Sequence, residues 1–177
     1  MADDWRITEN LPAVALSDGW YWYLAVAVQA ERVLSGSEGD VRRRADALLL
    51  VLALRQVVRA AELARATGSE RGSAILTDAL ERFDSLLPGA RSARDALEHF
   101  DDYLRGVGDA QQPRVPRRAR KPDEDLARAW RARFVATEGS YAVVVGDVTI
   151  DVAAARQAAD HLLMAIQRAG NALDGHR

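Results

Sequence analysis

Apolar side chains recur every three to four residues along the chain as far as residue 105. This is the period of an α-helix that buries one face. Segments rich in glycine, serine or proline interrupt the pattern at 35–39, 67–68 and 88–89, and such segments end helices. The pattern therefore predicts helices over about 18–34, 40–67, 70–87 and 92–105.

The helix expected over 40–67 has a centre, residues 47–54, that is apolar on every side. A helix of this kind is usually central in a bundle or lies in an interface between subunits. Short connections to the helices on either side favour antiparallel neighbours. We therefore expect a bundle with this helix at its centre, and the surplus of apolar surface predicts a homodimer.

The pattern changes after residue 107. Residues 108–122 form a basic segment that contains Pro113 and Pro116. From Trp130 onward apolar residues alternate with polar ones, as in a strand, and Gly146-Asp147 is a two-residue hairpin signal. We expect a β-ribbon over 130–150, followed by a helix over 151–173 that Asp151 caps.

Together these elements predict one mainly all-α domain over residues 1–177. The expected fold is an up-and-down helical bundle of four to five helices, with its main part over 12–107 and a small β-ribbon inserted before the last helix. A chain of 177 residues is long enough to bury its own core.

Composition excludes several classes of function. The chain has no cysteine, so disulfides, thiolate nucleophiles and cysteine zinc sites are excluded. No clustered His/Asp/Glu ligand set is visible in the sequence, so we expect neither a metal nor another cofactor. The net charge of -2 points to no strongly charged partner. The longest apolar runs are far below the ~20 residues that cross a bilayer, and the acidic N-terminus is unlike a signal peptide. We expect a cytoplasmic protein without membrane contact.

The sharpest candidate for chemistry is the stretch from Arg94 to His99, since the chain holds only 3 histidines. An arginine and an imidazole can bind a phosphate and move a proton without a metal. Asp95 is one helical turn before His99 and can orient its ring. The same spacing occurs at Arg156 and His161, so the bare pattern is not specific.

Context distinguishes the two pairs. Arg94 is followed by a short polar residue, Asp95, and His99 by Phe100-Asp101-Asp102-Tyr103. This stretch, in a late helix of an all-helical bundle, resembles the HEPN family (higher eukaryotes and prokaryotes nucleotide-binding domains). The resemblance covers the first four expected helices and not the β-ribbon.

The resemblance implies a small helical dimer that cleaves RNA without a metal, with Arg94, His99 and Asp95 at a site shared by two protomers. Neutral imidazole would remove the 2′-OH proton of RNA, and the arginine would stabilise the charge on the phosphate. It also implies a toxin or phage-defence setting, with a cognate antitoxin or a nucleotidyltransferase-like protein as partner.

Simpler interpretations stay open for the same residues. Arg94 and Glu98 have the spacing of an ordinary ion pair, and a solvated helix flank would explain both Arg94 and His99. His99 would alternatively be a half-buried histidine with a satisfied partner. The protein would then be a non-catalytic helical dimer that binds a partner or a nucleic acid, or an unrelated bundle. Convergence of Arg94 and His99 on an exposed cleft would favour catalysis.

The basic loop also has two interpretations. It can contact the phosphate backbone of RNA beside the site, or it can be a solvated linker stiffened by proline. Its basic residues are Arg114, Arg117, Arg118, Arg120 and Lys121.

Overall fold

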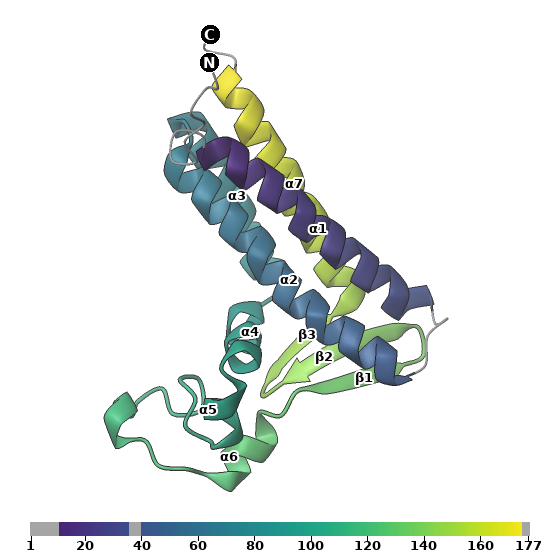
Figure 1. Cartoon of the computed structure of the whole chain (residues 1–177), viewed down its shortest axis with the longest axis vertical. Helices are drawn as coiled ribbons and strands as arrows, with labels where there is room; N and C mark the ends of the chain where they lie inside the picture. The colour runs from purple at the N-terminus through teal and green to yellow at the C-terminus, as the bar shows by residue number, and fades with distance from the viewer. Residues whose placement is uncertain (1–10, 36–39, 175–177) are drawn as a thin grey trace, which may run out of the picture.

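The computed structural model describes residues 11–35 and 40–174. A bundle of long helices forms its frame (Figure 1). The first helix packs along the second and against the last, and the third packs against the second and the last. The mainly helical bundle predicted from the sequence is confirmed, and the last helix completes it. The four helices are α1 (Leu11–Ser35), α2 (Asp40–Thr67), α3 (Glu70–Leu86) and α7 (Val152–Asp174).

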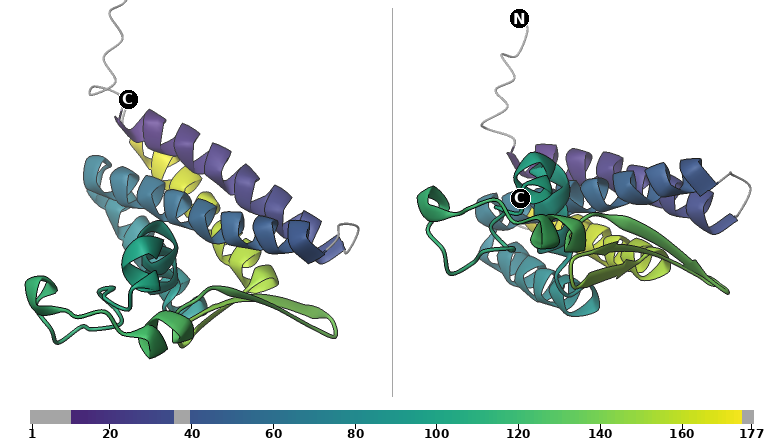
Figure 2. Two further views of the ribbon diagram at one scale, coloured as in Figure 1. Left: turned by 60° about the horizontal axis from the view of Figure 1, so that its bottom comes forward. Right: turned by 90° about the horizontal axis from the view of Figure 1, so that it is seen from below.

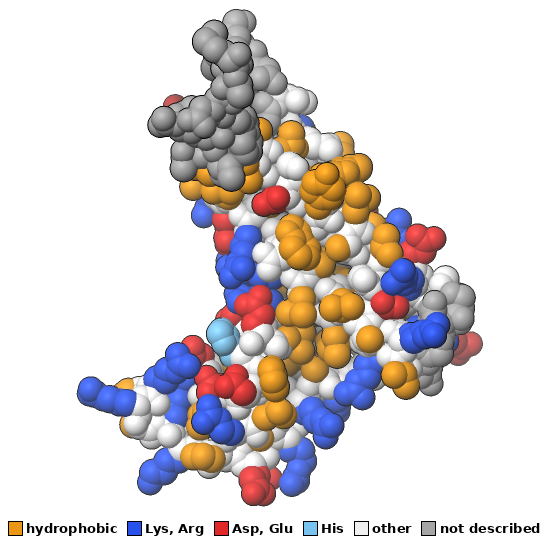
Figure 3. Space-filling view, viewed as in Figure 1, with side chains coloured by type: hydrophobic (Ala, Val, Ile, Leu, Met, Phe, Trp, Pro, Cys, Tyr) orange, Lys and Arg blue, Asp and Glu red, His pale blue; other side chains and the backbone are white. Residues whose placement is uncertain are grey.

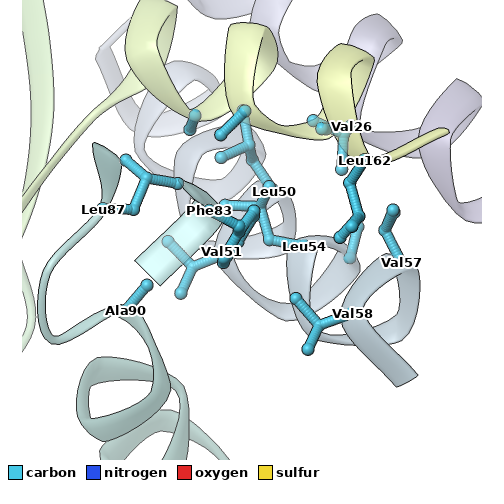
Figure 4. Packing of buried hydrophobic residues seen from close by; sticks show 14 of the residues in the cluster. Val26, Leu50, Val51, Leu54, Val57, Val58, Phe83, Leu87, Ala90 and Leu162 are labelled. Carbon is cyan, nitrogen blue, oxygen red and sulfur yellow. The ribbon is translucent and has the colours of Figure 1, made fainter. Parts of the chain in front are cut away.

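The core of the bundle is built around the apolar centre of α2. Leu50, Val51 and Val57 are at most 1% exposed and belong to the same buried cluster as Leu162 of α7 (Figure 4). Burying each of these side chains stabilises the fold by ~1.5–3 kcal/mol. Leu49 on the same helix is 50% exposed, so part of the apolar surface of α2 is not covered within the protomer.

The helix expected over 92–105 is broken at His99. The carbonyl of His99 accepts a hydrogen bond from the backbone N–H of Tyr103 over 3.2 Å, which starts a new helix. The break changes the buried face: Tyr103 is 5% exposed. Phe100 and Leu104, which one continuous helix over 92–105 would place on its apolar face, are instead 62% and 56% exposed. The two helices are α4 (Ala90–Glu98) and α5 (Phe100–Leu104).

A long loop, residues 105–123, leads from α5 to α6 (Glu124–Ala129) and contains the 3₁₀ turn η2 (Arg117–Ala119). The backbone N–H of Asp123 donates to the carbonyl of Arg105 over 2.9 Å and closes the base of the loop. Asp123 Oδ1 also accepts from the N–H of Leu126 over 3.0 Å. Asp123 therefore caps the start of the short helix α6.

The β-ribbon is an antiparallel sheet of three strands in the order β1-β2-β3. Val145 pairs with Val148 across the Gly146-Asp147 turn, so the predicted hairpin is confirmed. Strand pairing begins at Arg133 rather than at Trp130, because the Trp130 ring packs on Tyr103 with ring centroids 5.3 Å apart. The strands are β1 (Arg133–Thr137), β2 (Ser140–Val145) and β3 (Val148–Asp151).

The sheet packs against α2, α4 and α7. Asp151 Oδ1 accepts from the N–H of Ala154 over 2.8 Å, which confirms the predicted cap of the last helix. The sheet and the segment from α4 to α6 lie at the same end of the bundle (Figures 1 and 2). The residues of greatest chemical interest in the sequence are therefore in an insertion between α3 and α7.

Candidate functional site

Arg94 lies on the side of α4 that is turned toward the bundle. Its side chain is 12% exposed and lines a depression with Leu54 of α2 and Phe83 of α3. Its Nη1 atom is 2.7 Å from Asp95 Oδ1 and 2.6 Å from Glu98 Oε2. The guanidinium is thus held between two carboxylates of its own helix, which includes the expected Arg94–Glu98 pair.

His99 lies at the break between α4 and α5, and its side chain is exposed. A step of five residues rotates by about 140° around a helix, so His99 faces away from Arg94. It lines a hollow of about 100 Å³ together with Asp95, Tyr103 and Arg117. The structure therefore brings Asp95 and His99 together and adds Arg117 from the loop, while Arg94 is outside this hollow.

The acidic side chains around His99 are already paired with arginines. Asp95 contacts Arg94, as described above. Asp102, which also lines the hollow, is 2.5 Å from Arg105 Nη2 through Oδ1 and 2.9 Å from Arg117 Nη2 through Oδ2. The charge of these carboxylates is thus largely neutralised by neighbouring arginines, of which Arg117 itself lines the hollow.

The loop that carries Arg117 is held by its own polar side chains. Gln111 is 8% exposed, and its amide bonds the backbone of Tyr103, Leu126 and Gly108 over 2.8–3.0 Å. The Gln112 amide joins the two ends of the loop, because its Nε2 atom donates to the carbonyls of Gly106 and Lys121 over 2.7 and 2.8 Å. Residues 105–123 therefore form a loop whose conformation is held by internal hydrogen bonds, unlike a solvated linker.

Close packing at glycine also fixes this loop. A Cβ atom on Gly108 would lie 2.6 Å from the Tyr103 ring. Gly106 has φ +75°, and a Cβ atom there would overlap the backbone of Asp123. The absence of a side chain at these two positions therefore allows the loop to close against α5.

Two ionisable groups at the hollow have shifted pKa values. Burial raises the pKa of Tyr103, whose hydroxyl accepts from the Ala110 N–H over 3.1 Å. The hydrogen bond from Arg120 holds the pKa of Asp109 below its usual range. At neutral pH the hollow therefore has a protonated phenol and an ionised carboxylate on its wall.

The basic residues of the loop do not act as one surface. Arg117 is paired with Asp102. Arg120 is 9% exposed, is paired with Asp109 and donates to the carbonyls of Val107 and Val115. Arg120 is thus committed to holding the loop. The remaining basic side chains, Arg114, Arg118 and Lys121, are exposed.

The second arginine–histidine pair is also divided between two surfaces. His161 lines a hollow between α3 and α7. Arg156 is exposed and close enough to Tyr23 of α1 to influence its ionisation. The pKa of Tyr23 is raised, chiefly by a hydrogen bond to Asp160. Neither pair therefore meets in a single hollow of the protomer.

Among residues 11–35 and 40–174, no His, Asp and Glu side chains are grouped in threes so as to hold a metal ion. No helix in the described part of the chain is long and apolar enough to cross a membrane. The acidic start of the chain lies outside the described residues. No family model, curated protein or solved structure matches this chain.

Proposed function

We propose that the protein cleaves RNA without a metal, at the hollow around His99. The observation that carries this proposal is the exposed His99 side chain in a hollow shared with Asp95 and Arg117. These residues supply a proton acceptor, a carboxylate that can orient it and a phosphate-binding cation. The expected dimer and its toxin or defence setting with a cognate partner belong to the same proposal.

The chemistry uses the nucleophile that RNA carries. Neutral His99 would take the proton of the 2′-OH as this oxygen attacks the adjacent phosphorus. The bond from phosphorus to the 5′-oxygen breaks, and the imidazolium returns a proton to that oxygen. The products are a 2′,3′-cyclic phosphate and a 5′-hydroxyl end. DNA has no 2′-OH and would not react.

Arg117 is the cation in this proposal, because it is the arginine that lines the hollow with His99. Its side chain is 77% exposed, and Asp102 holds it until a phosphate competes for the guanidinium. Asp102 keeps a second cation, Arg105, at 2.5 Å, so releasing Arg117 does not leave its charge unpaired. Arg94 would then be a positioning residue that acts through Asp95.

A cleavage assay on single-stranded RNA with EDTA present tests the proposal. We expect His99→Gln to abolish cleavage and Arg117→Gln to reduce it by about 10²-fold or more. Arg94→Ala should have a smaller effect, which Arg94→Lys restores in part. His161→Gln tests the other arginine–histidine pair: cleavage that is lost in His161→Gln and kept in His99→Gln would move the site to α7.

Two results would overturn the assignment. One is a wild-type protein that cuts no RNA, and the other is activity that survives His99→Gln. A substrate with a single 2′-deoxy sugar at the cleaved position should be resistant. Cleavage of that substrate at the same bond would exclude attack by the 2′-OH.

A second candidate function is that of a non-catalytic helical dimer that binds a partner, and the apolar surface of α1 favours it. Trp20, Leu24 and Val28 follow one another at helical spacing and are 45%, 39% and 44% exposed. Orange side chains cover much of the bundle face in Figure 3. The pairing of Arg94 with two carboxylates points the same way.

Sedimentation tests the dimer itself. The wild type should sediment as a dimer at micromolar concentration, and Leu24→Arg should give a folded monomer. A wild type that stays monomeric at tens of micromolar would remove both the dimer and a site shared between protomers. A dimer without any RNA cleavage would leave the interaction function.

A further inference from the structure

We propose a second site, independent of RNA cleavage at His99: the hollow between α3 and α7 binds a phosphate monoester. This hollow has a volume of about 280 Å³, compared with about 100 Å³ for the one at His99. Arg82 from α3 and Arg168 from α7 line it together with His161. Two cations and an imidazole from facing helices thus share one open space.

The arginines of this hollow differ from those near His99 in their pairing. Within the described residues, neither Arg82 nor Arg168 forms an ion pair, whereas Arg94, Arg105 and Arg117 all do. Arg168 donates through Nε to the carbonyl of Met164 over 3.2 Å. That bond fixes the base of the guanidinium and leaves its two terminal nitrogens for a ligand. An anion between the two guanidinium groups would relieve their mutual repulsion.

His161 adds a third group suited to an anion. Its Nδ1 atom is buried and has no hydrogen-bond partner. A buried N–H without an acceptor costs more than a bare acceptor atom, so the favoured neutral tautomer has its proton on Nε2. The ring can then donate its Nε2–H to a ligand oxygen.

The other lining residues define the ligand further. Asp78 lies one turn before Arg82 on α3, and Ile75, Ala79 and Met164 supply apolar walls. One carboxylate against two arginines and a histidine leaves a net positive site that suits a single phosphate better than a polyphosphate. Asp78 can accept from a hydroxyl of the ligand. This combination fits a phosphate on a partly apolar, hydroxyl-bearing body, such as a nucleoside monophosphate or the 5′-phosphate end of an RNA.

Binding experiments with defined probes test this site. The probes are inorganic phosphate, a nucleoside 5′-monophosphate, and one short RNA with and without a 5′-phosphate. Binding is measured by calorimetry and by NMR of the His161 ring. We expect Arg82→Gln and Arg168→Gln each to weaken binding by about tenfold or more. Arg71→Gln on α3 and Arg156→Gln on α7, both at exposed positions, are the matched controls and should bind as the wild type does.

The comparison between probes distinguishes two sources of the bound phosphate. Preference for the free nucleotide identifies a small-molecule site, and preference for 5′-phosphorylated over 5′-hydroxyl RNA identifies a terminal-phosphate site. The proposal is overturned if none of the probes binds at millimolar concentration. It is also overturned if binding persists unchanged in Arg82→Gln and Arg168→Gln, or if the His161 ring signals do not move on binding. Activity of the His161→Gln protein on RNA does not enter this test, so the two proposals can fail separately.

Discussion

The buried amide of Gln111 allows a quantitative test of how the loop around His99 is held. Its Nε2 atom donates to the carbonyls of Tyr103 and Leu126 over 2.9 and 3.0 Å, and its Oε1 atom accepts from the N–H of Gly108 over 2.8 Å. Gln111→Met keeps the length of the side chain and removes all of these bonds. The cost depends on which backbone groups then lack a partner.

The three backbone groups are not equally dependent on Gln111. The carbonyls of Tyr103 and Leu126 keep a second donor each, because they also accept from the N–H groups of Gly106 and Trp130, both over 3.1 Å. The Gly108 N–H has no second acceptor among the described hydrogen bonds. An unpaired buried N–H costs about 1–3 kcal/mol, and each weakened carbonyl adds about 0.5 kcal/mol. We therefore expect the loop to open more easily by about 2–4 kcal/mol.

Hydrogen exchange followed by mass spectrometry measures this effect where it occurs. A change of about 2–4 kcal/mol corresponds to roughly 30- to 900-fold faster exchange for the protected amides of residues 108–126. The amides of α1 and α2 should exchange as in the wild type, because the bundle does not depend on this loop. Gln157→Met, at an exposed position of α7, is the control. Unchanged exchange in the loop, or faster exchange spread evenly over the bundle, would refute this account of the loop.

Two further changes test the same segment. Gly108→Ala places a Cβ atom 2.6 Å from the Tyr103 ring and should lower the free energy of unfolding by about 1–3 kcal/mol. The control Gly139→Ala, in open space with φ +76°, should lower it by only about 1 kcal/mol. Equal losses of the two variants in urea unfolding would contradict the packing argument. Because Arg120 lowers the pKa of Asp109, the stabilisation from their pair is present above the ordinary carboxyl pKa of about 4 and is lost as the pH falls through the lowered value. Protection of the loop amides from exchange should therefore fall in acid in the wild type, whereas in Asp109→Asn it should be lower and independent of pH. The two proteins should differ in loop stability by less than about 1 kcal/mol, because this carboxylate is mostly exposed. The same loss of protection in acid in both proteins would count against the pair.

The elements that depend on local sequence were predictable, and those that depend on distant contacts were not. The hairpin at Gly146-Asp147 and the cap at Asp151 are local signals, and both are confirmed. The break at His99 depends on burial of Tyr103, which packs on Trp130 in a segment 27 residues further along the chain. A helical wheel drawn for 92–105 alone places Phe100 in the core, because it contains no information about that contact.

In the candidate site, too, local features were predictable and features that depend on distant contacts were not. His99 and Asp95 are one helical turn apart, so their meeting at one hollow follows from local spacing. Asp102 and Gln111 were not identified, because their roles depend on the closed loop and on partners that the spacing does not reveal. A signal was nevertheless present: a loop with two adjacent glutamines between glycines and prolines has side-chain amides that can satisfy its own backbone.

The two arginine–histidine pairs show why spacing alone is a poor guide to a phosphate site. Five residues correspond to about 140° on a helix, so the arginine and the histidine of each pair face different surfaces. His99 instead shares its hollow with Arg117 from the loop, and His161 shares its hollow with Arg82 and Arg168. Because an arginine that already holds a carboxylate must exchange it for a phosphate, the unpaired arginines are the better indicator of an anion site. By this criterion the hollow at His161 should bind phosphate more readily, and the hollow at His99 should depend more steeply on competition between substrate and Asp102.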